Sequence, residues 1–196
     1  MSHTNTIKVW DPLVRWFHWI LVAAFTIAFI TEDDFLTLHV WAGYTVLGLL
    51  FIRLVWGFIG TRYARFSDFV HSPATVRAYL KDILHFRAKR YLGHNPAGGA
   101  MIVLLLVSLA LTTLSGLAVY GAADNAGLLA GWFGRLGERW ANIFEEVHEF
   151  FAGLSLSLVF IHVGGVLFES LLHRENLIKA MVNGYKHVTI KQESRS

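Results

Sequence analysis

Four apolar segments shape this chain of 196 residues, and each is long enough to cross a membrane as a helix. A helix rises 1.5 Å per residue, so about 20 residues span the roughly 30 Å of hydrocarbon in a bilayer. The segments cover about residues 13–31, 39–60, 97–121 and 147–171. The composition agrees, because 55% of the residues are hydrophobic and 16% are charged. We therefore expect an all-α integral membrane protein, a four-transmembrane-helix bundle in a single membrane domain over residues 1–196.

Cysteine is absent from the sequence. This excludes disulfides, iron–sulfur ligation, zinc–thiolate sites and covalent attachment of haem. The N-terminal sequence MSHTNTIKVWDP lacks a basic region followed by a short apolar core and a cleavage site. We therefore expect no signal peptide and a first span that is retained. The pI of 9.3 does not by itself indicate nucleic-acid binding, and we expect no nucleic-acid partner.

Charged residues are sorted along the chain in a way that predicts its topology. Lysine and arginine concentrate in the 61–96 connection and in the tail after Leu172, whereas the 31–38 and 122–146 connections are acidic. By the positive-inside rule we expect both termini and the 61–96 loop on the cytoplasmic side of a bacterial inner membrane. The 122–146 loop is then periplasmic.

Two further segments are expected to lie on the membrane surfaces. In the 61–96 loop, Ser72 and Pro73 can serve as the N-cap and first residue of an amphipathic helix on the cytoplasmic surface. The segment Leu128 to Phe144, which carries Trp132 and Trp140, is expected to do the same on the opposite surface.

Four histidines lie in the predicted spans, where ionisable side chains usually face the protein interior and carry a function. His18 and His39 lie near the starts of the first and second spans, and His148 and His162 both lie in the fourth. Fourteen residues are almost four helical turns, so His148 and His162 share one face about 21 Å apart. With the termini inside, His18 lies at the depth of His162, and His39 at the depth of His148.

Two histidine pairs at two depths suit two stacked b haems, since each haem iron takes two axial ligands and needs no covalent link. We expect His18 and His162 to bind the iron of a cytoplasmic-side haem, and His39 and His148 that of a periplasmic-side haem. Small residues such as Gly43 leave room for the macrocycles. Zinc would need three or four ligands at one depth. A lone membrane histidine is more often a hydrogen bonder in helix packing, so the pairing of all four favours haem.

The six other histidines fall in predicted loops or tails, where we expect solvated or interfacial side chains: His3, His71, His85, His94, His173 and His187. Arg53 follows His39 by fourteen residues, on the same face at the cytoplasmic level. We hypothesise that Arg53 pairs with a propionate of the inner haem; the alternative is that it snorkels to the nearby interface. Arg15 has the same two interpretations.

Four motifs together resemble the prokaryotic cytochrome b561 family, which includes hydrogenase b-type cytochrome subunits. They are VWDPLVRWFHW, LHVWAGY, GLAVYG and HEFFAGLSLSLVFIHVGG, and the resemblance covers about residues 7–188. It implies a di-haem membrane cytochrome in which His18 and His162 bind one haem and His39 and His148 the other.

The resemblance also implies electron transfer across the membrane between the quinone pool and a periplasmic donor or acceptor in a respiratory chain. Family partners include hydrogenase, formate dehydrogenase and c-type cytochromes, and the length of the fuller hydrogenase-type subunits ranks hydrogenase lower for this chain. A stand-alone quinone reductase that oxidises superoxide is an alternative. From another class, the alternative is a haem-free transporter or scaffold with proton-relay histidines.

No nucleophile, acid–base pair or phosphate loop occurs in the sequence. We therefore expect no catalytic side chains, and any enzymatic activity would be redox turnover at a quinone site. Membrane lipids and quinone are the expected small partners, and an oligomer is left open.

Overall fold

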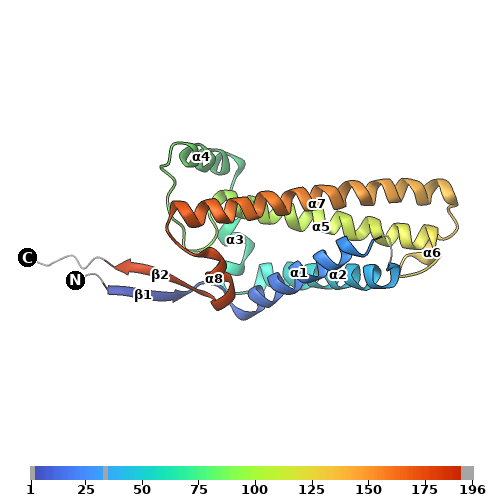
Figure 1. The fold of residues 1–196 in the computed structure, drawn as a ribbon, viewed down its shortest axis with the longest axis horizontal. Helices are drawn as coiled ribbons and strands as arrows, with labels where there is room; N and C mark the ends of the chain where they lie inside the picture. Colours follow the sequence, from blue (N-terminus) through green and yellow to red (C-terminus); the bar gives the residue numbers. More distant parts are fainter. Residues whose placement is uncertain (1–2, 33–34, 191–196) are drawn as a thin grey trace, which may run out of the picture. The chain divides into compact units, whose positions relative to one another are not determined.

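The computed structural model describes residues 3–32 and 35–190, and most of them are helical (Figure 1). Four helices are long and apolar enough to cross a membrane, as the sequence predicts: α1 (Pro12–Ile30), α2 (Leu36–Ile59), α5 (Pro96–Ala123) and α7 (Glu138–Leu172). The chain divides into two compact units. The first comprises Met1–His18, Val55–Ala100 and Gly164–Ser196, and the second Trp19–Leu54 and Met101–Val163.

Helix α7 begins earlier than its apolar run suggests. The sequence predicts a span from about residue 147, whereas the helix starts at Glu138. The expectation that Leu128 to Phe144 forms a separate surface helix is therefore wrong for its second half, and within its first half α6 (Ala130–Phe133) is a single turn. Glu145 and Glu146 end the apolar run, but glutamate is a good helix former and the helix continues through them. At 1.5 Å per residue, α7 is about 52 Å long, more than a bilayer core requires.

In the first unit, the cap predicted for the 61–96 loop is confirmed. Helix α4 (Pro73–Leu84) has Pro73 at its start, and Ser72 Oγ accepts a hydrogen bond from the Thr75 amide at 3.2 Å. The 3-10 turn η1 (Arg62–Ala64) and the short helix α3 (Phe66–Phe69) precede it. Tyr79 of α4 donates from its hydroxyl to Glu169 Oε1 over 2.9 Å, which fastens α4 to the end of α7. Burial and the Glu169 carboxylate raise the pKa of Tyr79, so its hydroxyl stays protonated.

The start of α1 is held by Asp11, whose carboxylate joins three segments of the first unit. Its Oδ1 accepts from the Val14 amide at 3.0 Å and so caps α1, with Pro12 as the first helical residue. Its Oδ2 accepts from Thr61 Oγ1 at 2.6 Å and from Trp56 Nε1 at 3.2 Å. Burial alone would raise the pKa of Asp11, but these hydrogen bonds outweigh it and lower that pKa. The residues around it form the core of this unit: Val9, Trp10, Val14, Ala64 and Ala180.

The two ends of the chain pair as a small sheet, so the expectation of terminal tails is wrong. Strands β1 (His3–Lys8) and β2 (Tyr185–Ile190) are antiparallel, with His3 opposite Ile190 and Lys8 opposite Tyr185 (Figure 1). Gly184 ends α8 (Leu177–Asn183) with a φ of 89°. A Cβ there would lie 2.7 Å from the Trp10 carbonyl oxygen, so this position requires glycine.

His94 also departs from the solvated side chain that its loop position predicts. Its ring packs against two aromatic rings of the first unit, with centroid separations of 4.5 Å to Trp10 and 5.1 Å to Phe69. An imidazole has an apolar face as well as polar nitrogens, so aromatic packing can outweigh hydration. His94 is therefore part of the packing around the start of α1.

In the second unit, α5 and α7 are joined by a cluster of hydroxyl groups. Ser155 of α7 is fully buried and lies 2.7 Å from Ser108 Oγ and 3.1 Å from Thr112 Oγ1, both on α5. Small residues allow helices to approach closely in a membrane, and hydroxyls can bond across the interface. Thr112 also contacts His148, because its carbonyl oxygen lies 2.9 Å from His148 Nδ1. The hydroxyl cluster therefore holds α5 against α7 close to His148.

Candidate cofactor site

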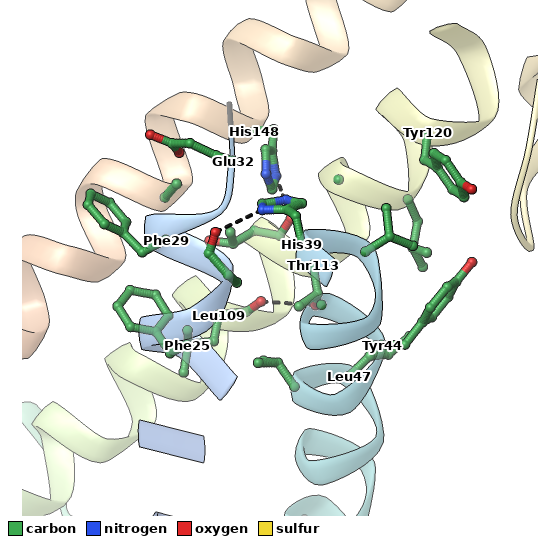
Figure 2. A pocket seen from close by; sticks show the side chains of 18 residues that line it. Phe25, Phe29, Glu32, His39, Tyr44, Leu47, Leu109, Thr113, Tyr120 and His148 are labelled. Carbon is green, nitrogen blue, oxygen red and sulfur yellow. Dashed lines mark hydrogen bonds between the residues drawn. The ribbon is translucent and has the colours of Figure 1, made fainter. Parts of the chain in front are cut away.

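His39 and His148 face each other in the second unit. Their ring centroids are 6.0 Å apart and the ring planes are nearly perpendicular, at 86° (Figure 2). His39 lies in the first turn of α2, and His148 lies within α7. The two histidines that the sequence places at the outer level are therefore neighbours in space.

Each of these rings is held through Nδ1 by a backbone carbonyl of another helix. His39 Nδ1 lies 2.8 Å from the Ala28 oxygen of α1, and His148 Nδ1 lies 2.9 Å from the Thr112 oxygen of α5. A carbonyl oxygen can only accept, so each Nδ1 carries the hydrogen and each Nε2 keeps its lone pair. Metal-binding histidines commonly have this arrangement, in which the second nitrogen fixes the ring and its tautomer.

The Ala28 carbonyl is suited to this role because it belongs to the last turn of α1. Carbonyls in the last turn of a helix have no complete set of partners within the helix. The Ala28 oxygen accepts only long hydrogen bonds from the Thr31 amide and hydroxyl, at 3.4 and 3.5 Å, so the bond from His39 at 2.8 Å is its shortest and links α1 to the start of α2. The short connection between these helices thus brings a carbonyl of the last turn of α1 and an imidazole together.

A cleft opens beside the two rings and is lined by residues of α1, α2, α5 and α7. Phe25 and Phe29 lie to one side of the histidines, and Tyr44 and Tyr120 lie on the other (Figure 2). The tyrosine end of the cleft therefore carries hydroxyl groups, whereas the phenylalanine end holds two aromatic rings and the carboxylate of Glu32. Gly43 also lines it, and a Cβ at this position would meet only open space, in keeping with the expectation that Gly43 leaves room for a flat group.

Gly116 of α5 is a site residue that the sequence alone does not predict. A Cβ on Gly116 would lie 2.9 Å from Cε1 and 3.1 Å from Nδ1 of the His148 ring. A larger residue would displace the ring from the Thr112 carbonyl. Gly116 opens the GLAVYG motif, but its function depends on how α5 is rotated toward α7, which the motif does not reveal.

The donor set fits a haem iron better than a multi-ligand metal site. Within residues 3–32 and 35–190, no group of three or more His, Cys, Asp or Glu side chains is placed to hold a metal ion. Haem needs only two axial ligands from the protein. Two imidazoles bound through Nε2 at about 2 Å would hold their ring centres about 6 Å apart. The observed separation of 6.0 Å agrees with that value.

The other predicted ligands lie in separate units. His18 is in the part of α1 that belongs to the first unit, and His162 is in the part of α7 that belongs to the second. Both side chains are half-buried. Their joint binding of a haem stays a prediction.

The two arginines have different surroundings. Arg53 of α2 is only 3% exposed, whereas a snorkelling arginine would extend along the surface of its helix. Burial favours the hypothesis of a propionate contact, which stays a prediction. Arg15 donates from Nη1 to the carbonyl of Val182, a contact that neither interpretation of Arg15 included.

Comparison with known proteins extends the motif evidence to nearly the whole chain. The family model for prokaryotic cytochrome b561 matches residues 9–184. Three curated relatives are each named as a probable Ni/Fe-hydrogenase B-type cytochrome subunit. The protein from Azotobacter vinelandii is 28% identical over 93% of this chain and 89% of its own length. Those from Rhizobium leguminosarum bv. viciae and Cupriavidus necator are 26% and 24% identical, over 92% and 91% of this chain and 88% and 86% of their own lengths. No solved structure matches the chain.

Proposed function

Because this chain belongs to the prokaryotic cytochrome b561 family, we propose that it is a di-haem b-type cytochrome that carries electrons across the bacterial inner membrane. Family membership confirms the resemblance in the motifs and, with four span-length apolar helices, makes this a multi-pass membrane cytochrome. In the proposal, the quinone pool exchanges electrons with one end and a periplasmic redox partner with the other.

One observation carries the proposal: His39 and His148 lie opposite each other with Nε2 of both rings left as a lone-pair donor. These two side chains would hold the outer haem, and His18 and His162 the inner one. The haem iron supplies one-electron redox chemistry when bound. The chain contributes the ligands, their orientation and an apolar setting that excludes water. Hydrogen bonds from Nδ1 to carbonyls increase the basicity of each Nε2 and favour the ferric state.

The continuity of α7 supports a second haem level. The helix runs without interruption from Glu138 to Leu172 and includes both His148 and His162. Fourteen residues correspond to about 21 Å along the axis, so one rigid element would carry a ligand at each level. An electron then crosses between fixed cofactors, and no carrier has to move through the protein.

The terminal sheet supports an even number of membrane crossings. Because β1 pairs with β2, the two ends of the chain meet in the first unit. Four spans return the chain to the side on which it began. The basic residues of the 61–96 connection and the C-terminal segment favour the cytoplasm for that side.

The relatives favour a hydrogenase as the periplasmic partner. Chain length alone ranks hydrogenase lower, because the fuller hydrogenase-type subunits are longer than this chain. The chain covers 86–89% of three proteins that are named as hydrogenase cytochrome subunits. Charge argues against superoxide as the substrate, since Glu32 lines the cleft beside His39 and His148. Asp124, Glu145, Glu146 and Glu149 add exposed negative charge to the second unit, which would repel an anion.

Spectroscopy of the purified protein tests the proposal. We expect b-type bands after reduction with dithionite and two haems per chain in a pyridine haemochrome assay. His39→Ala and His162→Ala should each remove one haem and leave the other. His85→Ala, which changes an exposed histidine at the end of α4, should retain both. A colourless wild-type protein would instead support the transporter or scaffold.

Reconstitution into liposomes distinguishes the partners. With quinone inside the bilayer and a periplasmic [NiFe] hydrogenase outside, hydrogen should reduce the haems and then the quinone. Superoxide alone should reduce them slowly. Fast reduction by superoxide without a protein partner would favour the stand-alone oxidoreductase.

A further inference from the structure

We propose that Tyr44 and Tyr120 donate hydrogen bonds to the propionate carboxylates of the outer haem and so set its orientation in the cleft. This inference rests on the proposed function. It adds two positioning residues that the histidine spacing does not identify, although Tyr44 lies in the motif LHVWAGY and Tyr120 in GLAVYG.

The two tyrosines come from different helices but meet at one corner of the cleft. Tyr44 is on α2 and Tyr120 is near the end of α5, and both are half-buried. Gly127 lies close to both side chains, because a Cβ on Gly127 would be 2.8 Å from Tyr44 Oη and 2.6 Å from Tyr120 Cδ1. Both side chains therefore pack against the same point of the backbone.

The backbone conformation of Gly127 allows this close contact with the two tyrosines. Gly127 has a φ of 77°, a conformation that residues with a Cβ rarely adopt. The Ala126 amide donates to the Tyr120 carbonyl at 3.2 Å, so the chain folds back over the end of α5. Glycine at this position lets the backbone lie directly against both phenol rings.

The remaining polar groups of the cleft cannot bind a carboxylate. Thr112 and Thr113 already donate from their hydroxyls to the carbonyls of Ser108 and Leu109, at 2.9 and 3.0 Å. Glu32, when ionised, can only accept hydrogen bonds and would repel a second carboxylate. Both histidines use Nδ1 on backbone carbonyls.

The tyrosine hydroxyls are different, because neither makes a hydrogen bond to another residue in the described part of the chain. No lysine or arginine of that part lines the cleft. Tyr44 and Tyr120 are thus the donors that are left.

The shape of haem makes such donors necessary. Haem is a flat, largely apolar disc with two carboxylates on one edge, and a carboxylate in an apolar setting needs donors or cations around it. Phe25 and Phe29 lie on the opposite side of the histidine pair from Tyr44 and Tyr120 (Figure 2). The apolar edge of the disc matches the phenylalanine end, where the nearby Glu32 carboxylate would repel a propionate, and the propionate edge matches the tyrosine end.

Tyr44→Phe, Tyr120→Phe and the double variant test the inference. The outer haem is identified as the one that His39→Ala removes. We expect each single variant to retain two haems but to shift the propionate bending band of that haem in resonance Raman spectra. Its midpoint potential should fall, because a carboxylate that loses a donor carries more uncompensated negative charge and favours ferric iron. The double variant should show the larger change in both.

Tyr185→Phe is the matched control, since Tyr185 is an exposed tyrosine on β2 in the first unit. It should change neither the Raman band nor either potential. If the double variant retains the band and the potential of the wild-type outer haem, the tyrosine proposal is overturned while the di-haem function stands. A wild-type protein without haem overturns both.

Discussion

The carbonyl oxygen of Thr112 lies 2.9 Å from Nδ1 of His148, so a helix without a histidine orients one on its neighbour. Helix α1 likewise orients His39 of α2, because the Ala28 carbonyl of α1 lies 2.8 Å from Nδ1 of His39. In the second unit, therefore, two helices supply the imidazoles and the other two hold them in place. This division gives each ring of the pair a fixed orientation.

Gly116→Ala should disrupt the proposed outer haem site. The added Cβ would lie 2.9 Å from the His148 ring, which must then move away from the Thr112 carbonyl. Alanine stabilises helices relative to glycine by about 1 kcal/mol, so a loss of haem cannot come from a weaker helix. We expect the haem content to fall from two toward one per chain, or the outer potential to shift.

Gly48→Ala is the control for this change, because Gly48 of α2 faces open space and does not line the cleft. It should leave both haems unchanged. Full haem content together with unaltered potentials in Gly116→Ala would show that the ring does not depend on this glycine.

The case of Gly116 shows where prediction from the sequence ends. Helical periodicity predicts which residues share a face of one helix, and it was enough to pair His39 with His148 by depth. It does not predict how α5 is rotated toward α7, which alone makes Gly116 and the Thr112 carbonyl part of the site. The same limit applies to Tyr44, Tyr120 and Gly127, which meet only when two helices and a turn are placed together.

The fold departs from the sequence-based prediction for related reasons. Apolar composition predicts the parts of helices that lipid can cover, so all four spans were found. It does not predict where α7 begins, because helix propensity continues beyond the apolar run. Pairing of β1 with β2 depends on residues at opposite ends of the chain, for which no local pattern exists.

Removing the carboxylate of Asp11 should destabilise the first unit. Asp11→Ala deletes the cap of α1 and leaves the hydroxyl of Thr61 and the indole of Trp56 without their acceptor. A cap contributes about 1 kcal/mol, and the half-buried indole of Trp56 can add about 1–3 kcal/mol when it loses its acceptor, whereas the exposed Thr61 can bond to water instead. We expect thermal unfolding in detergent to occur at lower temperature, with Ser72→Ala, the cap of the exposed helix α4, as a milder comparison.

Asp11 should also make stability depend on acid pH. Its folded pKa is lower than the ordinary value of 3.8, because hydrogen bonds to the carboxylate outweigh the opposing effect of burial. The resulting stabilisation is present above the unfolded pKa and is lost as the pH falls through the folded pKa. When the pH is lowered from 5 to about 2–4, wild type should therefore lose more stability than Asp11→Asn. Parallel pH curves for the two proteins would contradict this role.

Glu175 should be more important for the terminal sheet than Lys186, its buried partner on β2. Lys186 is 4% exposed, and burial lowers its pKa although Glu175 opposes that shift from 3.7 Å. Glu175→Gln removes the partner of both Lys186 and Arg90 and should cost roughly 3 kcal/mol, whereas Lys186→Met should be nearly neutral. Hydrogen exchange of the β1 and β2 amides measures this difference. Equal protection losses in the two variants would contradict it.

The angle between the two imidazole planes predicts the electron paramagnetic resonance spectrum of the oxidised protein. The rings of His39 and His148 are 86° apart, and their bonds to two backbone carbonyls hold them in those planes. Nearly perpendicular axial ligands leave two iron d orbitals close in energy, which produces a strongly anisotropic low-spin ferric signal rather than the rhombic signal of parallel rings. We expect His39→Ala to abolish that signal and His85→Ala to preserve it. A purely rhombic spectrum from a protein with two haems would show that the rings rotate when the haem binds, against the restraint that the Ala28 and Thr112 carbonyls impose.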